Sequence, residues 1–415
     1  MKSGKSSNRA LICLAAYLLL AVPLVVRGQS MVDTANVLSI GENVVNNFSH
    51  LQPFYEKLYA LKAGNTDQVN IIHIGDSHIQ ADFLTEVVRK QLQLMFGNAG
   101  RGLVVPGRVA GTNEPLNFVT HSTTKWNSKR IIHPAKPLPI GIGGITINTQ
   151  EAGASFDLRM NDQTTDYSFN TVTLFYEQGR QNYGIAVRDS LFRELAVFPS
   201  DGTLDQGFAT VTLPSYYRKI NFQTLRQRDD QSQANLFGLS LENGKPGVLY
   251  HSIGVNGAKY EHYNSSDAFA RQTKILRPDL IIISLGTNES VEYPNIRKTF
   301  SSEISRLVTS LQAVNPDAVF LLITPPDSFL RKVKTNPGIE TIRMQIIEYA
   351  VENGIAFWDM FKVNGGKNSA AQWKMKGYLR PDGIHFSRDG YAYQGKLLFD
   401  AIMRGYDEYV SNRHP

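Results

Sequence analysis

The sequence has almost no cysteine, with Cys13 alone in 415 residues. Cys13 lies in the apolar stretch from 10 to 26, which follows a basic start and precedes the letters VRGQS. This order is typical of a secretory signal peptide, which we expect over residues 1–28. The mature chain would then form no disulfide bond, so its stability would depend on burial of a hydrophobic core.

The sequence also lacks a strong charge of either sign. Four of its 43 basic residues lie in the first 28 positions, so removal of this segment lowers the excess over the 37 acidic residues from six to two. Such a balance does not indicate a nucleic-acid-binding protein, and we expect no nucleic acid partner.

A long uninterrupted apolar run is missing as well. Pro23 interrupts the stretch in the leader, which is shorter than the roughly 20 residues of a membrane-spanning helix. We therefore expect no stable membrane anchor after the leader is removed, and we expect export to the periplasm or cell envelope. The metal-binding patterns HEXXH and CxxC and a phosphate-binding loop are absent too, so no metal ion and no cofactor are expected.

The periodicity of apolar residues divides the rest of the chain into three regions. Residues 36–104 follow a helix, strand, helix pattern, with IIHIG as a β-branched run and apolar residues at helical spacing from Ile79 to Leu92. Residues 105–248 contain roughly seven or eight short alternating runs separated by turn residues, which predict an all-β sandwich or jelly roll. From 249 to 412, buried strands such as LIIIS alternate with amphipathic helices, expected for example over 295–314 and 394–409.

Continuous apolar strands that alternate with amphipathic helices imply a parallel sheet with helices on both faces. The sequence therefore predicts a three-layer α/β fold. Residues 36–104 and 249–412 would form one discontinuous domain, and residues 105–248 would form a β domain inserted at a surface loop.

Polar residues follow two apolar strands of the α/β regions, where a parallel sheet binds its ligands. Ser77 comes after IIHIGD and before a helix, so it is a candidate nucleophile whose N–H would lie near the positive helix end. The alternative is that Asp76 or Ser77 only caps the helix. Asn288 follows LIIISLGT, and its uncharged amide would suit an oxyanion hole, although an ordinary turn explains it equally well.

Two further stretches complete the set of candidates. Gly257 lies in GVNGA, where glycine would let a backbone N–H approach a ligand closely, or would simply allow a tight turn. Asp382 and His385 lie three residues apart in DGIH, an arrangement in which the carboxylate can orient a general base. Taken alone, this pair would fit a metal site or a plain loop equally well.

Together, the stretches GDSH, GVNGA, GTNE and DGIH resemble the four motif blocks of the SGNH, or GDSL-like, hydrolases. The resemblance covers about residues 50–104 and 249–405, and it departs from the family pattern at Glu289, where Asp is common. It implies a flavodoxin-like fold with a catalytic triad of Ser77, His385 and Asp382. It also implies an oxyanion hole formed by Ser77, Gly257 and Asn288.

The spacing between the first two blocks adds to the resemblance, because Ser77 and Gly257 lie 180 positions apart. An inserted β domain at this point resembles the arrangement in bacterial peptidoglycan O-acetylesterases, which carry a carbohydrate-binding-module-like insertion. The resemblance implies an exported serine esterase that removes O-acetyl groups from a cell-envelope glycan such as peptidoglycan. An O-acetyltransferase with the same triad, or an inactive glycan-binding protein, remains an alternative.

Other polar and aromatic residues have simpler explanations. Alternation along the strand places His73 in the core, and His78 is expected to contact the helix cap or the wall of the cleft rather than substrate. The aromatic residues of the β region would stack on sugar rings or, more commonly in a sandwich, belong to its core: Trp126, Tyr176, Tyr183, Tyr216 and Tyr217.

Overall fold

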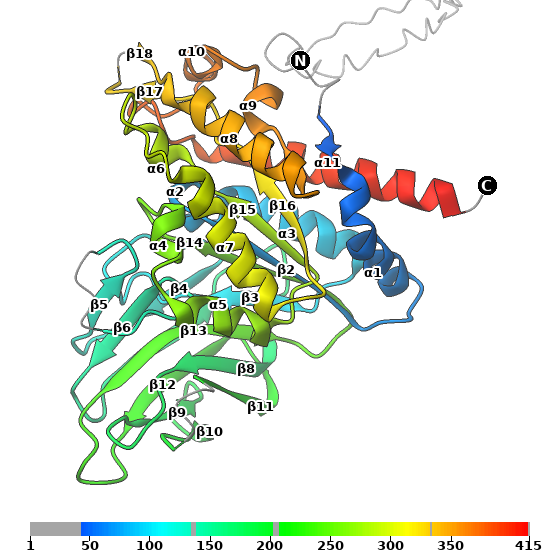
Figure 1. Ribbon diagram of the computed structural model, residues 1–415. Helices are drawn as coiled ribbons and strands as arrows, with labels where there is room; N and C mark the ends of the chain where they lie inside the picture. Colours follow the sequence, from blue (N-terminus) through cyan, green and yellow to red (C-terminus); the bar gives the residue numbers. More distant parts are fainter. Residues whose placement is uncertain (1–42, 134–137, 202–206, 333, 414–415) are drawn as a thin grey trace, which may run out of the picture. The chain divides into compact units, whose positions relative to one another are not determined.

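The computed structural model describes residues 43–133, 138–201, 207–332 and 334–413 (Figure 1). The leader expected over residues 1–28 lies outside these ranges, as do residues 36–42 of the expected hydrolase region. Within the described residues, every helix is too short or too polar to span a membrane.

A six-stranded sheet forms the centre of the α/β part, in the order β1-β19-β16-β15-β2-β14. Neighbouring strands pair in parallel, except that β1 is antiparallel to β19. The strands are β1 (Val45–Asn46), β2 (Gln68–Gly75), β14 (Gly247–Gly254), β15 (Leu280–Ser284), β16 (Val319–Ile323) and β19 (Ala356–Trp358). Every residue of β2 after Gln68 is buried, as expected for a strand covered on both faces.

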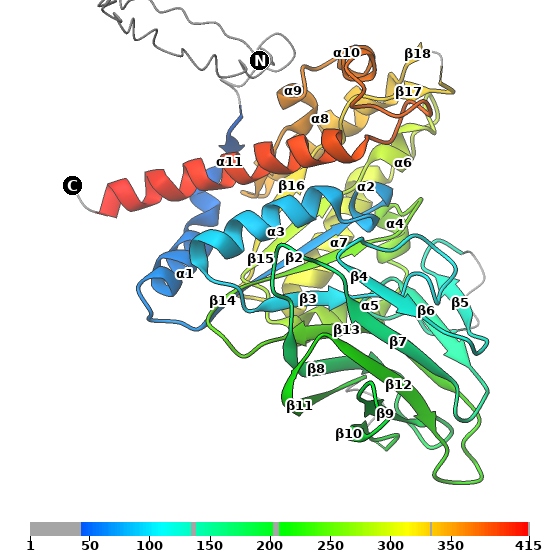
Figure 2. The same ribbon diagram turned by 180° about the vertical axis from the view of Figure 1, so that it is seen from behind.

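Helices cover both faces of this sheet (Figures 1 and 2). Val69 and Ile71 of β2 share one hydrophobic cluster with α1 (Gln52–Lys62), α3 (Phe83–Phe96) and α11 (Arg388–Arg413). Ile72 and Ile74 share the other cluster with α5 (Asp267–Thr273), α7 (Phe300–Val314) and α8 (Gly338–Glu352). The three-layer α/β fold expected from the sequence is therefore confirmed.

Short elements connect these layers. They are η3 (Phe48–Leu51), α2 (Ser77–Gln80), α4 (Tyr260–Tyr263), η4 (Lys274–Leu276), α6 (Thr287–Ser290), β17 (Phe329–Leu330), β18 (Lys334–Thr335), α9 (Met360–Val363) and α10 (Ser369–Met375).

The region between α3 and β14 forms two further sheets, in the orders β10-β9-β12-β7-β4 and β11-β8-β13-β6-β5. Their strands are β4 (Phe118–His121), β5 (Asn127–Arg130), β6 (Ile145–Thr149), β7 (Ser155–Met160), β8 (Phe169–Tyr176), β9 (Gly184–Arg188), β10 (Glu194–Phe198), β11 (Phe208–Tyr217), β12 (Lys219–Leu225) and β13 (Ala234–Glu242). Side chains from both sheets, such as Phe222 and Leu174, belong to one buried cluster. The expected β-sandwich is therefore confirmed.

The division into a hydrolase domain and an inserted domain stays a prediction. β3 (Gly100–Val104) precedes position 105, yet it pairs with β13 of the sandwich, with Leu103 opposite Ser240. The cluster that fills the sandwich also continues to one face of the main sheet through Ile72 and Ile74. The two parts of the chain thus share one continuous apolar interior.

The helix expected from Ile79 onward is interrupted, because Asp82 adopts a left-handed conformation with φ of 63° between α2 and α3. Aspartate tolerates this conformation better than most residues do. Here the turn places its carboxylate among buried donors: Arg89 Nη1 at 3.0 Å, Arg101 Nη2 at 2.9 Å, and Asn117 Nδ2 at 2.8 Å. Apolar periodicity alone does not reveal such a break.

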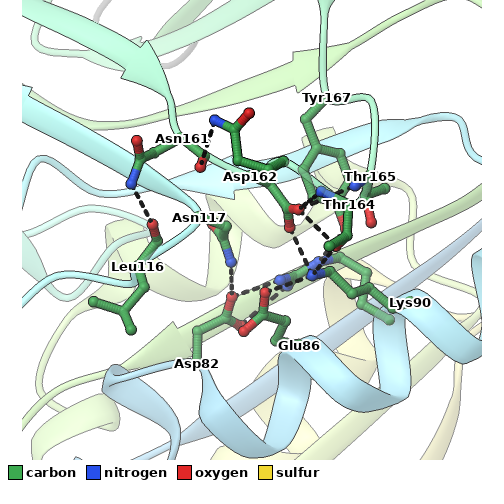
Figure 3. A network of polar contacts seen from close by, with 12 residues as sticks. Asp82, Glu86, Lys90, Leu116, Asn117, Asn161, Asp162, Thr164, Thr165 and Tyr167 are labelled. Atoms are coloured by element: carbon green, nitrogen blue, oxygen red, sulfur yellow. Dashed lines mark hydrogen bonds and ion pairs between the residues drawn. The ribbon is translucent and has the colours of Figure 1, made fainter. Parts of the chain in front are cut away.

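These contacts attach α3 to the β-sandwich (Figure 3). Asn117 directly precedes β4, and Arg101 lies in β3. Farther along α3, Lys90 Nζ lies 2.9 Å from Glu86 and 2.7 Å from Asp162 in the loop after β7. The helix that follows the candidate nucleophile is therefore fastened to the sandwich at two points.

Candidate active site

Three adjacent strands of the main sheet, β15, β2 and β14, end at the edge that carries the candidate residues. Ser77 follows β2 at the start of α2, Asn288 lies in α6 after β15, and Gly257 lies in the turn after β14. Because parallel strands run in one direction, their carboxyl ends bring these three segments together.

Ser77 is the first residue of α2, and Asp76 is its N-cap. Asp76 Oδ1 accepts a hydrogen bond from the His78 N–H at 2.9 Å, so the capping role falls to Asp76. A Cβ atom at Gly75 would lie 2.3 Å from Ile79 Cγ1, so only glycine allows the chain to turn this sharply from strand to helix. The turn leaves the hydroxyl of Ser77 available for another partner.

That partner is His385, whose Nε2 lies 2.8 Å from Ser77 Oγ. On the other side of the ring, His385 Nδ1 lies 3.2 Å from Asp382 Oδ2. The side chains of His385 and Asp382 are 33% and 37% exposed, so the group stays open to a substrate. The structure therefore brings together all three residues expected to form a triad, in the order that proton transfer from Ser77 requires.

The loop between α10 and α11 holds Asp382 in place through backbone contacts. Asp382 Oδ1 accepts hydrogen bonds from the N–H groups of Ile384 and His385, both at 2.9 Å. Burial acts to raise the pKa of Asp382, but these hydrogen bonds outweigh it and lower the pKa below its usual value. Asp382 is therefore ionised and can accept the Nδ1–H of His385.

A backbone hydrogen bond and a β-bridge join the two sides of this loop. Arg380 N–H donates to the His385 carbonyl at 2.8 Å, and Leu379 pairs with Phe386 as an antiparallel bridge. Phe386 is buried and packs edge-on against Trp373, with ring centroids 5.2 Å apart. The position of His385 is thus fixed by a buried neighbour in sequence.

The three expected oxyanion donors lie in the three segments that follow β2, β14 and β15. The Ser77 N–H is at the first position of α2, where a helix offers no internal acceptor. Gly257 has φ of 81° in a turn that Ala258 N–H closes onto the Val255 carbonyl at 2.9 Å. Asn288 Nδ2 donates to Asp76 Oδ2 at 3.1 Å and to the Ala258 carbonyl at 3.0 Å. The amide of Asn288 therefore bridges the two other segments.

Asp76 is a site residue that the sequence indicated only as a cap. It is 1% exposed, and burial raises its pKa to about 7 against the hydrogen bond from the His78 N–H. Its second oxygen receives the Asn288 amide, so this carboxyl group connects the helix of the nucleophile with the amide donor. A position next to the serine was the only signal for it in the sequence.

His78 is a buried neighbour of His385. It is 8% exposed, its Nδ1 lies 2.9 Å from the Tyr391 hydroxyl, and its ring lies 5.5 Å from the His385 ring. Burial, and then the nearby His385, lower the pKa of His78 to about 3, so the ring is neutral. His73 is a packed residue, as expected, with its two ring nitrogens 2.7 Å from Tyr250 Oη and 2.6 Å from Ser284 Oγ.

Glu289, where the motif departs from the family pattern, is buried rather than directed to solvent. Its Oε1 accepts a hydrogen bond from the Tyr260 N–H at 2.9 Å. Its Oε2 has no hydrogen-bond partner among the residues that the structure describes. Burial raises the pKa of Glu289 to about 8, so the side chain is mostly protonated at neutral pH.

The aromatic residues of the sandwich divide into core and surface. Tyr176 and Tyr183 are buried, whereas Tyr216 is 49% exposed. Trp126 packs edge-on against Phe156, and it also lines a cleft of about 670 Å³ on the sandwich. Four cations and one carboxylate share the lining of this cleft: Arg108, Lys125, Arg159, Lys219 and Asp157.

Comparison with known proteins agrees with this arrangement. Residues 222–393 match the family model of the GDSL-like lipase/acylhydrolase family. The structure of a peptidoglycan O-acetylesterase superposes with a TM-score of 0.73 at 22% identity, covering 86% of this chain and 96% of that chain. The resemblance to the GDSL-like hydrolases is thereby confirmed, and the second match shows the fold.

Two other solved structures match less well. A family two carbohydrate esterase from Cellvibrio japonicus matches at 13% identity and a TM-score of 0.29, covering 71% of this chain and 99% of that chain. A lipase/acylhydrolase from Enterococcus faecalis matches at 21% identity and a TM-score of 0.31, covering 38% and 77%. Among curated protein sequences there is no significant match.

Proposed function

We propose that the chain is a serine esterase that removes O-acetyl groups from peptidoglycan in the cell envelope. The observation that carries this proposal is the 2.8 Å contact between Ser77 Oγ and His385 Nε2, with Asp382 behind the ring. The fold shared with a peptidoglycan O-acetylesterase supports the same activity. Export is part of the proposal and depends on the leader in the sequence.

The reaction uses the chain's own residues throughout. Ser77 Oγ attacks the acetyl carbonyl carbon while His385 Nε2 accepts the hydroxyl proton, and Asp382 keeps the Nδ1–H of the ring in place. The N–H groups of Ser77 and Gly257 hold the oxyanion, and the Asn288 amide joins them when one of its two N–H groups leaves the Asp76 carboxyl or the Ala258 carbonyl. Each such donor lowers the barrier by roughly 3 kcal/mol.

Collapse of the tetrahedral intermediate breaks the ester bond. His385 returns the proton to the departing sugar oxygen, which leaves an acetyl group on Ser77. Water then attacks this acetyl-enzyme as His385 takes a proton from it, and the second tetrahedral intermediate releases acetate and restores the Ser77 hydroxyl.

The cleft on the sandwich supports peptidoglycan as the glycan. Its lining contains four cations and one carboxylate, which favours an acidic polymer over a neutral one. Peptidoglycan carries carboxylates on its peptide stems, whereas acetylated xylan without acidic branches does not. Trp126 lines this cleft and is partly exposed, so its ring is available for contact with a sugar.

Ser77→Ala in the purified mature protein tests the assignment. We expect p-nitrophenyl acetate hydrolysis to fall to background while the thermal unfolding curve stays unchanged. Ser301→Ala, at an exposed serine on α7, is the matched control and should retain full activity. Turnover by the Ser77→Ala variant would refute the proposed nucleophile.

Acetate release from O-acetylated peptidoglycan and from neutral acetylated xylan then tests the substrate. We expect faster release from peptidoglycan, with a rate that falls as salt is added, because salt screens the charges in the cleft. Faster release from xylan would contradict the assignment to peptidoglycan while leaving the esterase activity intact.

A further inference from the structure

Asn256, which precedes Gly257 in the turn after β14, is held at both its backbone and its side chain. Its N–H donates to Gln80 Oε1 at 2.6 Å, although the two residues lie 176 positions apart. Its side-chain Nδ2 donates to Asn113 Oδ1 at 2.7 Å. Asn113 lies in the loop between β3 and β4, so the second contact comes from the region that leads into the sandwich.

Gln80 connects these two contacts to each other. It is the last residue of α2, three positions after Ser77, and it is 7% exposed. While its Oε1 accepts from Asn256, its Nε2 lies 3.0 Å from the Asn113 carbonyl oxygen and 2.9 Å from Asn113 Oδ1. Asn256, Gln80 and Asn113 therefore form a closed triangle of hydrogen bonds around the start of the turn.

The position of the Gly257 N–H, though not its direction, depends on this triangle. The N–H belongs to the peptide group between Asn256 and Gly257, which is the central peptide of the turn. A φ of 81° at Gly257 is typical of the third residue of a type II turn. In a type I turn the same peptide group is rotated by about half a turn, so its N–H points the opposite way. The φ of Asn256 is the same in both turn types, so its contacts do not choose between them; they fix where the turn lies beside α2.

We propose that Gln80 and Asn113 are positioning residues that hold this turn in place, so that the Gly257 N–H stays within reach of the oxyanion. This inference rests on the proposed function, since it concerns the donor that Gly257 supplies to the reaction. It means that a residue from outside the hydrolase motifs, in the loop before β4, completes the active site. An exposed side chain can do this because its partners, Gln80 and Asn256, lie against the turn.

The test compares Asn113→Leu with Asn113→Asp, using p-nitrophenyl acetate so that contacts with a glycan play no part. Asn113→Leu removes the Oδ1 acceptor, and we expect kcat to fall about 10-fold or more with KM within twofold, because a displaced donor weakens the transition state alone. Asn113→Asp retains Oδ1 and should keep kcat within threefold of wild type. Asn161→Leu, at another exposed asparagine of the β region, is the control and should behave as wild type.

Gln80→Glu provides a second route to the same question. It retains Oε1 for the Asn256 N–H but removes the Nε2 donor to Asn113, so kcat should fall here too. Because both changes open the same triangle, the double variant Gln80→Glu with Asn113→Leu should be no worse than the poorer single variant.

Wild-type kcat in Asn113→Leu would overturn the inference, as would a rise in KM alone or equal losses in Asn113→Leu and Asn113→Asp. The proposed function would fail on a different result: the Ser77→Ala variant would hydrolyse p-nitrophenyl acetate as fast as wild type. The two ideas are therefore tested by separate measurements.

Discussion

Asp76 Oδ2 accepts a hydrogen bond from Asn288 Nδ2 at 3.1 Å, while the other oxygen of the same carboxyl group caps α2. One buried group thus fixes both the helix that begins at Ser77 and the amide that faces the reaction. The pKa of Asp76 is raised to about 7 by burial, so near neutral pH the group exchanges between its acid and carboxylate forms. Both forms can accept from the Asn288 amide.

Asp76→Asn should therefore impair the amide of Asn288. The new side chain can still cap the helix with its oxygen, but its NH₂ group then faces the NH₂ group of Asn288, and two donors cannot bond to each other. We expect kcat for p-nitrophenyl acetate to fall by about 10-fold to 100-fold, with little change in KM. A kcat equal to that of wild type would show that Asp76 does not orient Asn288.

Asp382→Asn should reduce kcat by roughly 1,000-fold, because an amide in place of the carboxylate no longer fixes the Nδ1–H of His385. The backbone contacts of the loop accept an asparagine oxygen equally well, so the melting temperature should change little. Asp389→Asn, at an exposed aspartate seven positions along, is the control. Comparable activity of the two variants would contradict the role of Asp382.

Glu289→Gln should change the pH dependence of stability. The pKa of Glu289 is about 8 in the folded protein, against 4.5 as its ordinary value, because of burial. A raised acid pKa gives stability that is present below pH 4.5 and is lost as the pH rises through 8. Glutamine is neutral throughout, so the variant should gain on wild type over this range, by at most about 1.4 kcal/mol per pH unit.

Urea unfolding of both proteins at several pH values between 4.5 and 9 measures this difference directly. Titrating groups that do not interact with Glu289 cancel from the comparison, whereas Asp76, whose pKa is about 7 and whose charge raises the pKa of Glu289, contributes to the difference. A constant difference across the range would mean that Glu289 is ionised in the folded state.

Asp82→Asn should destabilise the fold without touching the triad. Burial acts to raise the pKa of Asp82, but Arg89 and Arg101 hold it well below its usual range, so its charge balances two buried guanidinium groups. Removing that charge should cost about 3–5 kcal/mol of unfolding free energy, measured in urea. Asp230→Asn, which breaks an exposed pair with Arg180, should have no measurable effect.

The edge of the sheet that carries the candidate residues was predictable because these residues follow strands. Ser77 and Asn288 each come directly after a run of buried β-branched residues, and the carboxyl ends of parallel strands must share one edge of the sheet. Asp382 and His385 were predictable as a pair because three positions suffice to orient the ring. Their distance from Ser77 was not, since it depends on how α10 and α11 pack.

Hydrogen bonds between polar side chains far apart in the sequence are not indicated by any pattern of residues. The hydrogen bond from Asn256 to Gln80 joins residues 176 positions apart, and neither residue type is unusual in a turn or a short helix. The left-handed Asp82 was hidden because apolar residues keep helical spacing on both sides of it. In each case one further partner, Asn117 for Asp82 and Asn113 for Gln80 and Asn256, lies in the β region, whose periodicity predicts strands and nothing about these contacts.

The hydrogen bonds that Asp82 and Asn113 make limit how this chain can be shortened or recombined. Deletion of the sandwich would also remove Asn117, which donates a hydrogen bond to the buried carboxylate of Asp82. It would remove Asn113 as well, which accepts a hydrogen bond from Asn256 in the turn before Gly257. A shortened version of this chain would need both losses repaired first. The β region is thus an integral component of the structure rather than an accessory.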